Sequence, residues 1–245
     1  MPGMEQVRSD KLNIEVLAGR DGIAHRAVEL FMDEAERGVK ARGRFAVAVS
    51  GGRTPGRFFE LLGERSEAGV WAGAEVFWAD ERYVPRTAAE SNYGLAWGAW
   101  LSRVSVPEGQ VHGVATDLED AHQAARAYER TLCEVLGPMP VLDLVLLGMG
   151  RDGHTAALFP GFRSEDGRLA IAVKRPDGLI GVTLTPRVLL AARRLVVMVS
   201  GADKAETLKG AFTTGPDAVR FPIQMLWPVL DRVLWLVDRE AVGLL

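Results

Sequence analysis

Residues 45–55 read Phe-Ala-Val-Ala-Val-Ser-Gly-Gly-Arg-Thr-Pro, an apolar run followed by a glycine-rich turn and a proline. Five consecutive apolar residues are typical of a strand that is buried on both faces of a parallel sheet. In the dipeptide that ends the stretch, the hydroxyl of Thr54 is suited to cap a helix and Pro55 to occupy its first position. This stretch therefore predicts a strand, a tight turn and the start of a helix.

The same pattern recurs along the chain. Six further apolar runs lie at residues 14–17, 75–79, 142–147, 180–184, 195–199 and 233–237. Between them, apolar residues recur at helical spacing after Asp21 and after Asp117, while Ser91 and Thr185-Pro186 are suited to begin other helices. Neither a linker nor a repeat divides the chain. We predict an α/β fold, a single domain over residues 1–245 with a Rossmann-like, open, mostly parallel sheet and helices on both faces.

Composition excludes several classes of protein. Hydrophobic residues make up 48% of the chain and charged residues 25%, as in an ordinary globular protein, and the net charge of −3 argues against nucleic acid as a partner. The longest apolar stretches fall far short of the roughly 20 residues of a membrane span. The only cysteine, Cys133, cannot form an intramolecular disulfide, and residues 1–20 contain no apolar signal core. We expect a cytoplasmic protein that does not bind membranes.

Polar residues follow four of the predicted strands, at residues 50–55, 80–83, 148–155 and 200–204. Ligands of open parallel sheets bind beyond the carboxyl ends of the strands. We therefore expect these four segments to meet at one site.

The first segment has the features of an anion site. Ser50, Gly51, Gly52 and Thr54 precede a predicted helix, whose free amide groups and dipole favour a phosphate, although the segment also suits a tight turn without a ligand. A nucleotide-binding P-loop is excluded, because Arg57 and Phe58 replace the required lysine and hydroxyl residue. The stretch also nearly matches a nucleophile elbow, so Ser50 as a catalytic nucleophile remains a minor alternative.

The segment after residues 142–147 contains His154, two residues after Asp152. An imidazole titrates near about 6.5 when unperturbed, and a carboxylate that orients it makes it a suitable general base. The glycine spacing at 148–153 matches a dinucleotide fingerprint, but Pro160-Gly161 prevents the long helix that NAD binding requires. We expect structural roles for the other histidines and no metal site, because His25, His112 and His122 lack ligand spacing.

Two cations complete the candidate site. Residues Asp80-Glu81-Arg82 are suited to a solvated loop with a local ion pair, but beside an anion site Arg82 could bind a phosphate or a developing oxyanion. Lys204 lies in the first turn of a predicted helix at 202–212, where a cation opposes the helix dipole. A bound anion explains this unfavourable position better than an exposed lysine without a function does.

Five motifs occur together and in order: Ser50-Gly51-Gly52-Arg53-Thr54-Pro55, Asp80-Glu81-Arg82, Ser91-Asn92-Tyr93, Asp152-Gly153-His154-Thr155-Ala156 and Gly201-Ala202-Asp203-Lys204-Ala205. With these motifs the chain resembles the 6-phosphogluconolactonases. The resemblance implies cytoplasmic hydrolysis of 6-phospho-D-glucono-1,5-lactone in the pentose phosphate pathway, without metal, cofactor or covalent intermediate. It implies that His154 activates water and Asp152 fixes the imidazole, while Arg82, oriented by Asp80, stabilises the oxyanion or reaches the phosphate. The phosphate would be held by Ser50, Gly51, Gly52, Thr54 and Lys204.

Two alternatives remain open. Glucosamine-6-phosphate deaminases share the glycine loop and the Asp-Gly-His motif, but they carry a glutamate five residues after the histidine, where this chain has Phe159. A non-catalytic sugar-phosphate sensor would keep the anion loop but would have lost the Asp152 and His154 pair. The chain departs from the lactonases at Gly181, where they often carry an arginine, and Lys174 or Arg175 could supply the missing contact.

Overall fold

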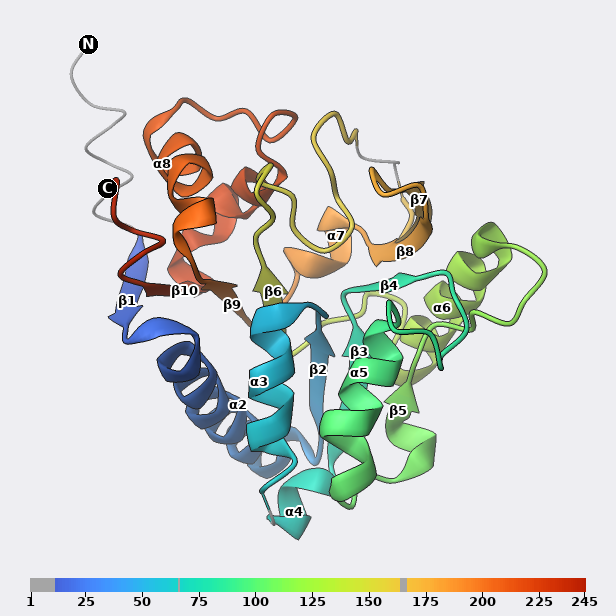
Figure 1. Ribbon diagram of the computed structural model, residues 1–245. Helices are drawn as coiled ribbons and strands as arrows, with labels where there is room; N and C mark the ends of the chain where they lie inside the picture. The colour runs from blue at the N-terminus through green and yellow to red at the C-terminus, as the bar shows by residue number, and fades with distance from the viewer. Residues whose placement is uncertain (1–11, 66, 164–166) are drawn as a thin grey trace.

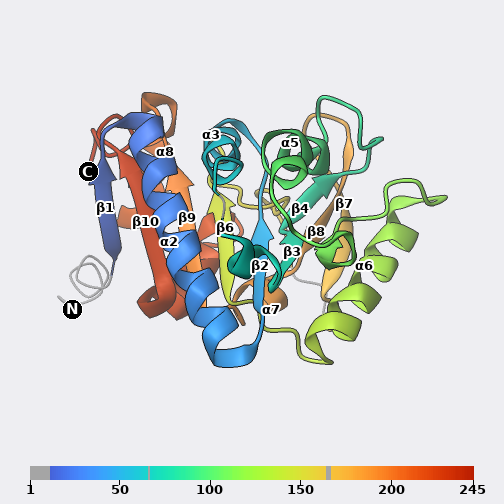
Figure 2. The ribbon, with the colours of Figure 1, turned by 90° about the horizontal axis from the view of Figure 1, so that it is seen from below.

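The computed structural model describes residues 12–65, 67–163 and 167–245 (Figure 1). Within these residues, seven parallel strands form one sheet in the order β1-β10-β9-β6-β2-β3-β5, seen side by side in Figure 2 as far as β3. The strands are β1 (Asn13–Leu17), β2 (Phe45–Val49), β3 (Ala74–Trp78), β5 (Val111–His112), β6 (Leu144–Gly148), β9 (Arg194–Val199) and β10 (Val233–Asp238). The prediction of an α/β fold with a mostly parallel sheet is confirmed.

A second, smaller sheet is antiparallel and has the order β4-β8-β7, with β4 (Asp80–Arg82), β7 (Ala170–Lys174) and β8 (Ile180–Leu184). The run at 180–184 is thus a strand, as predicted, but it does not belong to the parallel sheet. The prediction of a loop at 80–83 was wrong for its first three residues, because β4 pairs with β8. The charged side chains of β4 do not resemble those of a strand, because this strand is held by backbone pairing with a segment that is distant in the sequence.

Helices cover both faces of the large sheet. The described helices are α2 (Gly19–Arg42), α3 (Arg53–Leu62), α4 (Ala68–Trp71), α5 (Asn92–Ala99), α6 (Ala121–Leu136), α7 (Pro186–Leu189) and α8 (Ala205–Thr213), and the 3-10 segments are η1 (Leu101–Arg103), η2 (Glu108–Gln110), η3 (Ala202–Lys204) and η4 (Pro222–Arg232). Alternate side chains of β2 point to opposite faces: Phe45 packs in the core with α2, α3 and α5, whereas Ala46 packs in the core with α6, α8 and η4. None of the helices in the described residues combines the length and hydropathy of a membrane span.

Three helix starts were predicted from capping residues, with different outcomes. Ser91 caps α5 as predicted, because its hydroxyl accepts a hydrogen bond from the amide of Gly94. Thr54 does not cap α3: the N-cap is Gly52, at a φ of 113° that favours glycine, so Thr54 lies inside the first turn. Thr185 precedes the single turn of α7, but its hydroxyl donates to the carbonyl of Arg168 instead.

The order of the strands creates a crevice at one end of the sheet. From β2 the chain proceeds through β3 and β5 toward one edge, and from β6 it proceeds through β9 and β10 toward the other. β2 and β6 are neighbours, paired from Val47 with Leu144 to Val49 with Leu146. The connections that follow these two strands therefore diverge, which is where open α/β sheets bind their ligands.

Candidate active site

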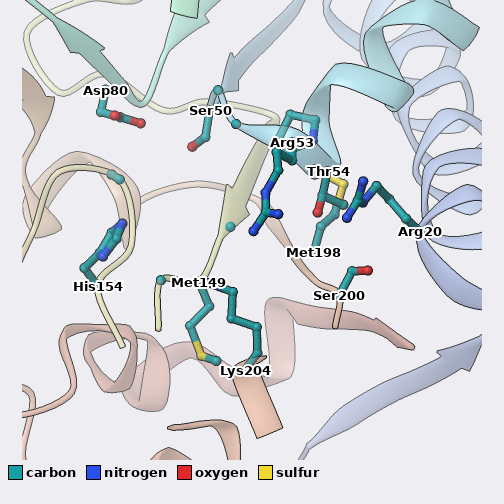
Figure 3. A pocket seen from close by; sticks show the side chains of 16 residues that line it. Arg20, Ser50, Arg53, Thr54, Asp80, Met149, His154, Met198, Ser200 and Lys204 are labelled. Atoms are coloured by element: carbon teal, nitrogen blue, oxygen red, sulfur yellow. The ribbon is translucent and has the colours of Figure 1, made fainter. Parts of the chain in front are cut away.

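A cavity of about 200 Å³ lies at this crevice (Figure 3). Its lining residues are Arg20, Ser50, Gly51, Gly52, Arg53, Thr54, Pro55, Asp80, Gly148, Met149, Gly150, His154, Ala156, Met198, Ser200 and Lys204. All four polar segments predicted to meet contribute to this cavity. The expected convergence of the loops is therefore confirmed.

One side of the cavity is positively charged. In Figure 3, Arg20, Arg53 and Lys204 lie on the side away from Asp80 and His154, with the hydroxyls of Thr54 and Ser200 among them. Arg20 was missed in the sequence, although it follows β1 at the same edge of the sheet as the other loops. Three cations that line the same cavity as the start of α3 make this side suitable for a phosphate.

Lys204 is the most enclosed of these cations, since its side chain is 15% exposed. Burial lowers the pKa of its ammonium below the ordinary value; Asp203 opposes this effect, while Arg151 and Arg53 add to it. Asp203 is shared among neighbouring cations, at 2.7 Å from Nε of Arg151 and 4.0 Å from Nζ of Lys204. A phosphate beside Lys204 would supply the negative charge that this ammonium needs.

His154 and Asp152 form a hydrogen-bonded pair at the opposite side of the cavity. Nδ1 of His154 lies 2.5 Å from Oδ1 of Asp152, and the backbone amide of His154 donates to the same oxygen at 3.1 Å. Burial opposes ionisation of Asp152, but the hydrogen bond and charge of His154 hold the pKa of Asp152 below its ordinary value. Because an ionised carboxylate only accepts, Nδ1 carries the hydrogen and Nε2 is left to take up a proton.

The loop that holds His154 depends on glycine for its tight path. A Cβ at Gly150 would lie 2.0 Å from Nδ1 of His154, so no larger residue fits behind the imidazole. The amide of Gly150 donates to the carbonyl of His154 at 2.8 Å, which closes the turn. The ring of Phe159 packs against the imidazole with a centroid distance of 4.6 Å. As predicted from Pro160-Gly161, no helix of the described residues follows β6 directly, so the dinucleotide fold is absent there.

Asp80 lines the cavity, while the next residue points away from it, as strand alternation requires. Glu81 is buried and accepts hydrogen bonds from the amides of Arg82, Asn92 and Tyr93 at 2.6–2.8 Å; burial raises its pKa in spite of these bonds. Asn92 in turn donates from Nδ2 to the carbonyl of Asp80 at 2.7 Å and to Oδ2 at 3.3 Å. Asn92 is thus a structural link between α5 and Asp80, a role that the sequence motif did not reveal.

Arg82 is not among the residues that line the cavity. Its Nη1 lies 3.0 Å from the position that a Cβ at Gly51 would occupy, so the guanidinium stands beside the glycine loop. The described residues contain no hydrogen bond or ion pair between Arg82 and Asp80; Oδ2 of Asp80 instead meets Asn92 and Arg175. In the described residues there is therefore no contact through which Asp80 would orient Arg82 as predicted.

Among the described residues, Ser50 has no hydrogen-bond partner that would activate it. Its hydroxyl is buried and lacks a hydrogen bond within the described chain, and His154 is engaged with Asp152. Of the other histidines, His25 contacts Asp21 and His112 contacts Glu75, both outside the cavity. Within the described ranges, no three His, Cys, Asp or Glu side chains are grouped as a metal site would require.

The chain is similar to known proteins over most of its length. The sequence profile of the family described as glucosamine-6-phosphate isomerases/6-phosphogluconolactonase matches residues 18–235. The chain belongs to this family. It is 35% identical to a 6-phosphogluconolactonase of Nostoc sp. over 236 residues, covering 94% of this chain and 97% of that protein. It is 32% identical to a 6-phosphogluconolactonase of Haemophilus influenzae, covering 81% and 87%. The structure of 6-phosphogluconolactonase from Trypanosoma cruzi superposes with a TM-score of 0.85 at 29% identity, covering 96% of this chain and 97% of that one.

The resemblance to the lactonases implied an arginine at the position where this chain has Gly181. Of the two residues that could compensate for the missing arginine, Lys174 is exposed, whereas Arg175 is buried. Cδ of Arg175 lies 3.3 Å from the position that a Cβ at Gly181 would take. Arg175 therefore occupies the space beside Gly181.

Proposed function

We propose that the chain hydrolyses 6-phospho-D-glucono-1,5-lactone to 6-phospho-D-gluconate, the lactone hydrolysis of the pentose phosphate pathway. The observation that carries this proposal is that the hydrogen-bonded pair of His154 and Asp152 lies on one side of the cavity, while a cluster of cations lies on the opposite side. A lactone with a phosphate at its far end presents a carbonyl and a dianion at two separated points. The cavity offers a base at one side and a phosphate site at the other. The lone cysteine, Cys133, is consistent with a cytoplasmic enzyme.

At the phosphate end, the amides of Gly51 and Gly52, the hydroxyls of Ser50 and Thr54, and the Lys204 ammonium bind the anion. Arg20 and Arg53 line the same side of the cavity and add to its positive charge. Arg82 contributes from beside Gly51, a position that favours the anion loop over a direct contact with the lactone carbonyl. Binding at this end places the distant carbonyl near His154.

At the carbonyl end, Nε2 of His154 takes a proton from water while the water oxygen forms a bond to the carbonyl carbon. The tetrahedral intermediate then breaks the bond to the ring oxygen, and the proton on the imidazolium goes to that leaving oxygen. Asp152 keeps the proton on Nδ1 and stabilises the imidazolium. Asp80, which faces the same cavity, accepts a hydrogen bond from a substrate hydroxyl.

The test is turnover of fresh 6-phosphogluconolactone by the purified chain, followed as acid release above the spontaneous rate. Glucosamine 6-phosphate, with ammonia release as the readout, is the parallel substrate. Acid release without ammonia release is expected, because Phe159 stands where the deaminases carry a glutamate. Ammonia release would favour the deaminase alternative. Tight binding of 6-phosphogluconate without turnover would favour a sensor.

Ser50→Ala tests whether the buried hydroxyl binds or reacts. Loss of one hydrogen bond from this hydroxyl to the phosphate dianion, worth about 1.5–3 kcal/mol, should raise KM by roughly 10- to 150-fold and leave most of kcat. The measurement is steady-state kinetics with the lactone. Complete loss of kcat at unchanged KM would instead make Ser50 the nucleophile.

The lowered pKa of Lys204 predicts a pH dependence of anion binding. The ammonium binds phosphate only when protonated, and a bound dianion favours that form, so affinity is full at low pH and falls as pH rises through the lowered pKa. Binding of 6-phosphogluconate should therefore weaken at a lower pH than an ordinary lysine would produce. Calorimetric titration between about pH 7.5 and 10.5 measures this, because the phosphate, with a pKa near 6, stays dianionic throughout. In Lys204→Ala the weakening should be absent; an equal weakening there would assign it to another group.

A further inference from the structure

Arg175 is a buried arginine just outside the cavity, with a residue exposure of 9%. It follows β7 and packs beside Gly181 of β8, where its Cδ passes 3.3 Å from the position of an absent Cβ. A side chain at residue 181 would compete for this space. The glycine therefore permits an arginine to enter from the neighbouring strand.

The guanidinium contacts two parts of the active site. Its Nη1 lies 3.9 Å from Oδ2 of Asp80, and its Cζ lies 5.3 Å from the centre of the Phe159 ring. That ring in turn packs against His154. On the outer side, Nε and Nη2 of Arg175 donate to Asp177 at 3.1 Å, which fixes the side chain in place.

Asp80 needs such a partner. The residue is 6% exposed, and a buried charge is costly unless it is paired. Within the described residues, Arg175 is the one cation at ion-pair distance from Asp80. This contact and the hydrogen bond from Asn92 both reach Oδ2, so neither occupies Oδ1.

We propose that Arg175 is a positioning residue: it holds the Asp80 carboxylate in place at the cavity and supports the ring behind His154. Gly181 is the residue that makes room for it. The proposal rests on the proposed lactonase function, and it adds a specific role for a side chain that does not line the cavity. It concerns the hydroxyl and carbonyl end of the substrate and leaves the phosphate end unchanged.

The first experiment is Arg175→Met in the full chain, which keeps an apolar stem and removes the charge. We expect kcat/KM for the lactone to fall roughly 10- to 100-fold, since displacement of groups around a reacting centre has effects of this size. Inhibition by inorganic phosphate, which engages only the cationic side, should stay within about twofold of wild type. The control is Arg194→Met, which removes a partly buried arginine of β9 that pairs with Glu34 of α2, away from the cavity. That variant should retain wild-type kcat/KM, and thermal unfolding of both variants shows whether they fold.

The second experiment returns the charge from the other strand. Arg175→Gly combined with Gly181→Arg directs a guanidinium into the same space and should recover most of the activity that Arg175→Gly alone loses. In Asp80→Asn, Arg175→Met should have a smaller effect than in the wild type, because the contact with the carboxylate is already lost and only the support of the Phe159 ring remains. Wild-type turnover with an unchanged kcat/KM in folded Arg175→Met would overturn this proposal alone. Failure of the wild type to hydrolyse the lactone would overturn the proposed function instead. If phosphate inhibition and turnover were lost in equal proportion in Arg175→Met, the arginine would have a general structural role. That result would also overturn the proposed positioning role of Arg175.

Discussion

Replacing His154 with asparagine should lower kcat for the lactone by roughly 10²–10⁴-fold, the usual contribution of a general base. Asparagine lacks a group that takes up a proton at neutral pH. Its amide is nevertheless able to donate to Asp152, so the loop has a replacement for the bond from Nδ1. Because the cations of the phosphate site are on the other side of the cavity, affinity for 6-phosphogluconate should change little.

A matched control exists in the same chain. His25 also pairs with an aspartate, with Nε2 at 3.4 Å from Asp21, but it is exposed on α2 and outside the cavity. His25→Asn should retain wild-type kcat, measured by the same acid-release assay. If His154→Asn keeps more than a third of wild-type kcat, His154 is not the base and the proposed mechanism is wrong.

The His154 and Asp152 pair was predictable because it is local. A single residue, Gly153, separates the partners, a buried strand precedes them and a proline ends the segment, so the chain itself determines that they meet. The convergence of four loops was predictable for a similar reason: the carboxyl ends of parallel strands lie at the same end of the sheet. These are short-range features combined with one rule of sheet topology.

Other features of the site depend on contacts between distant segments. Asn92 reaches Asp80 from a helix twelve residues along the chain, and Arg175 reaches the same carboxylate from the position directly after β7. The charged stretch at 80–82 looks like a loop until its pairing with β8 is known. Periodicity carries no information on such pairings, because each depends on the register of strands far apart in sequence.

Arg20 illustrates a different omission. It follows β1 at the same edge as the other loops and lines the cavity, so the rule that selected the four segments applies to it as well. Arg20 does not lie next to a glycine-rich motif, so the sequence contained no second feature that would mark it as a site residue. The carboxyl end of every strand, with or without a motif, therefore has to be considered when a site of this fold is assembled from sequence.

Lys204→Ala should raise KM for the phosphorylated lactone by roughly 10- to 150-fold, equivalent to a charge-assisted hydrogen bond of about 1.5–3 kcal/mol. The side chain is largely enclosed and lines the cationic side of the cavity, so water does not replace it fully. The phosphate does not change during hydrolysis. Ground state and transition state therefore lose the same contact, and kcat should stay comparatively intact.

The control for this variant is Lys209→Ala, which removes an exposed lysine from α8 outside the cavity and should leave KM unchanged. A second comparison uses unphosphorylated gluconolactone, for which Lys204→Ala should have little effect on kcat/KM because there is no anion to hold. Two results would remove Lys204 from the phosphate site. One is wild-type affinity of the variant for 6-phosphogluconate, and the other is an equal proportional loss with both lactones, since a contact to phosphate accounts for neither.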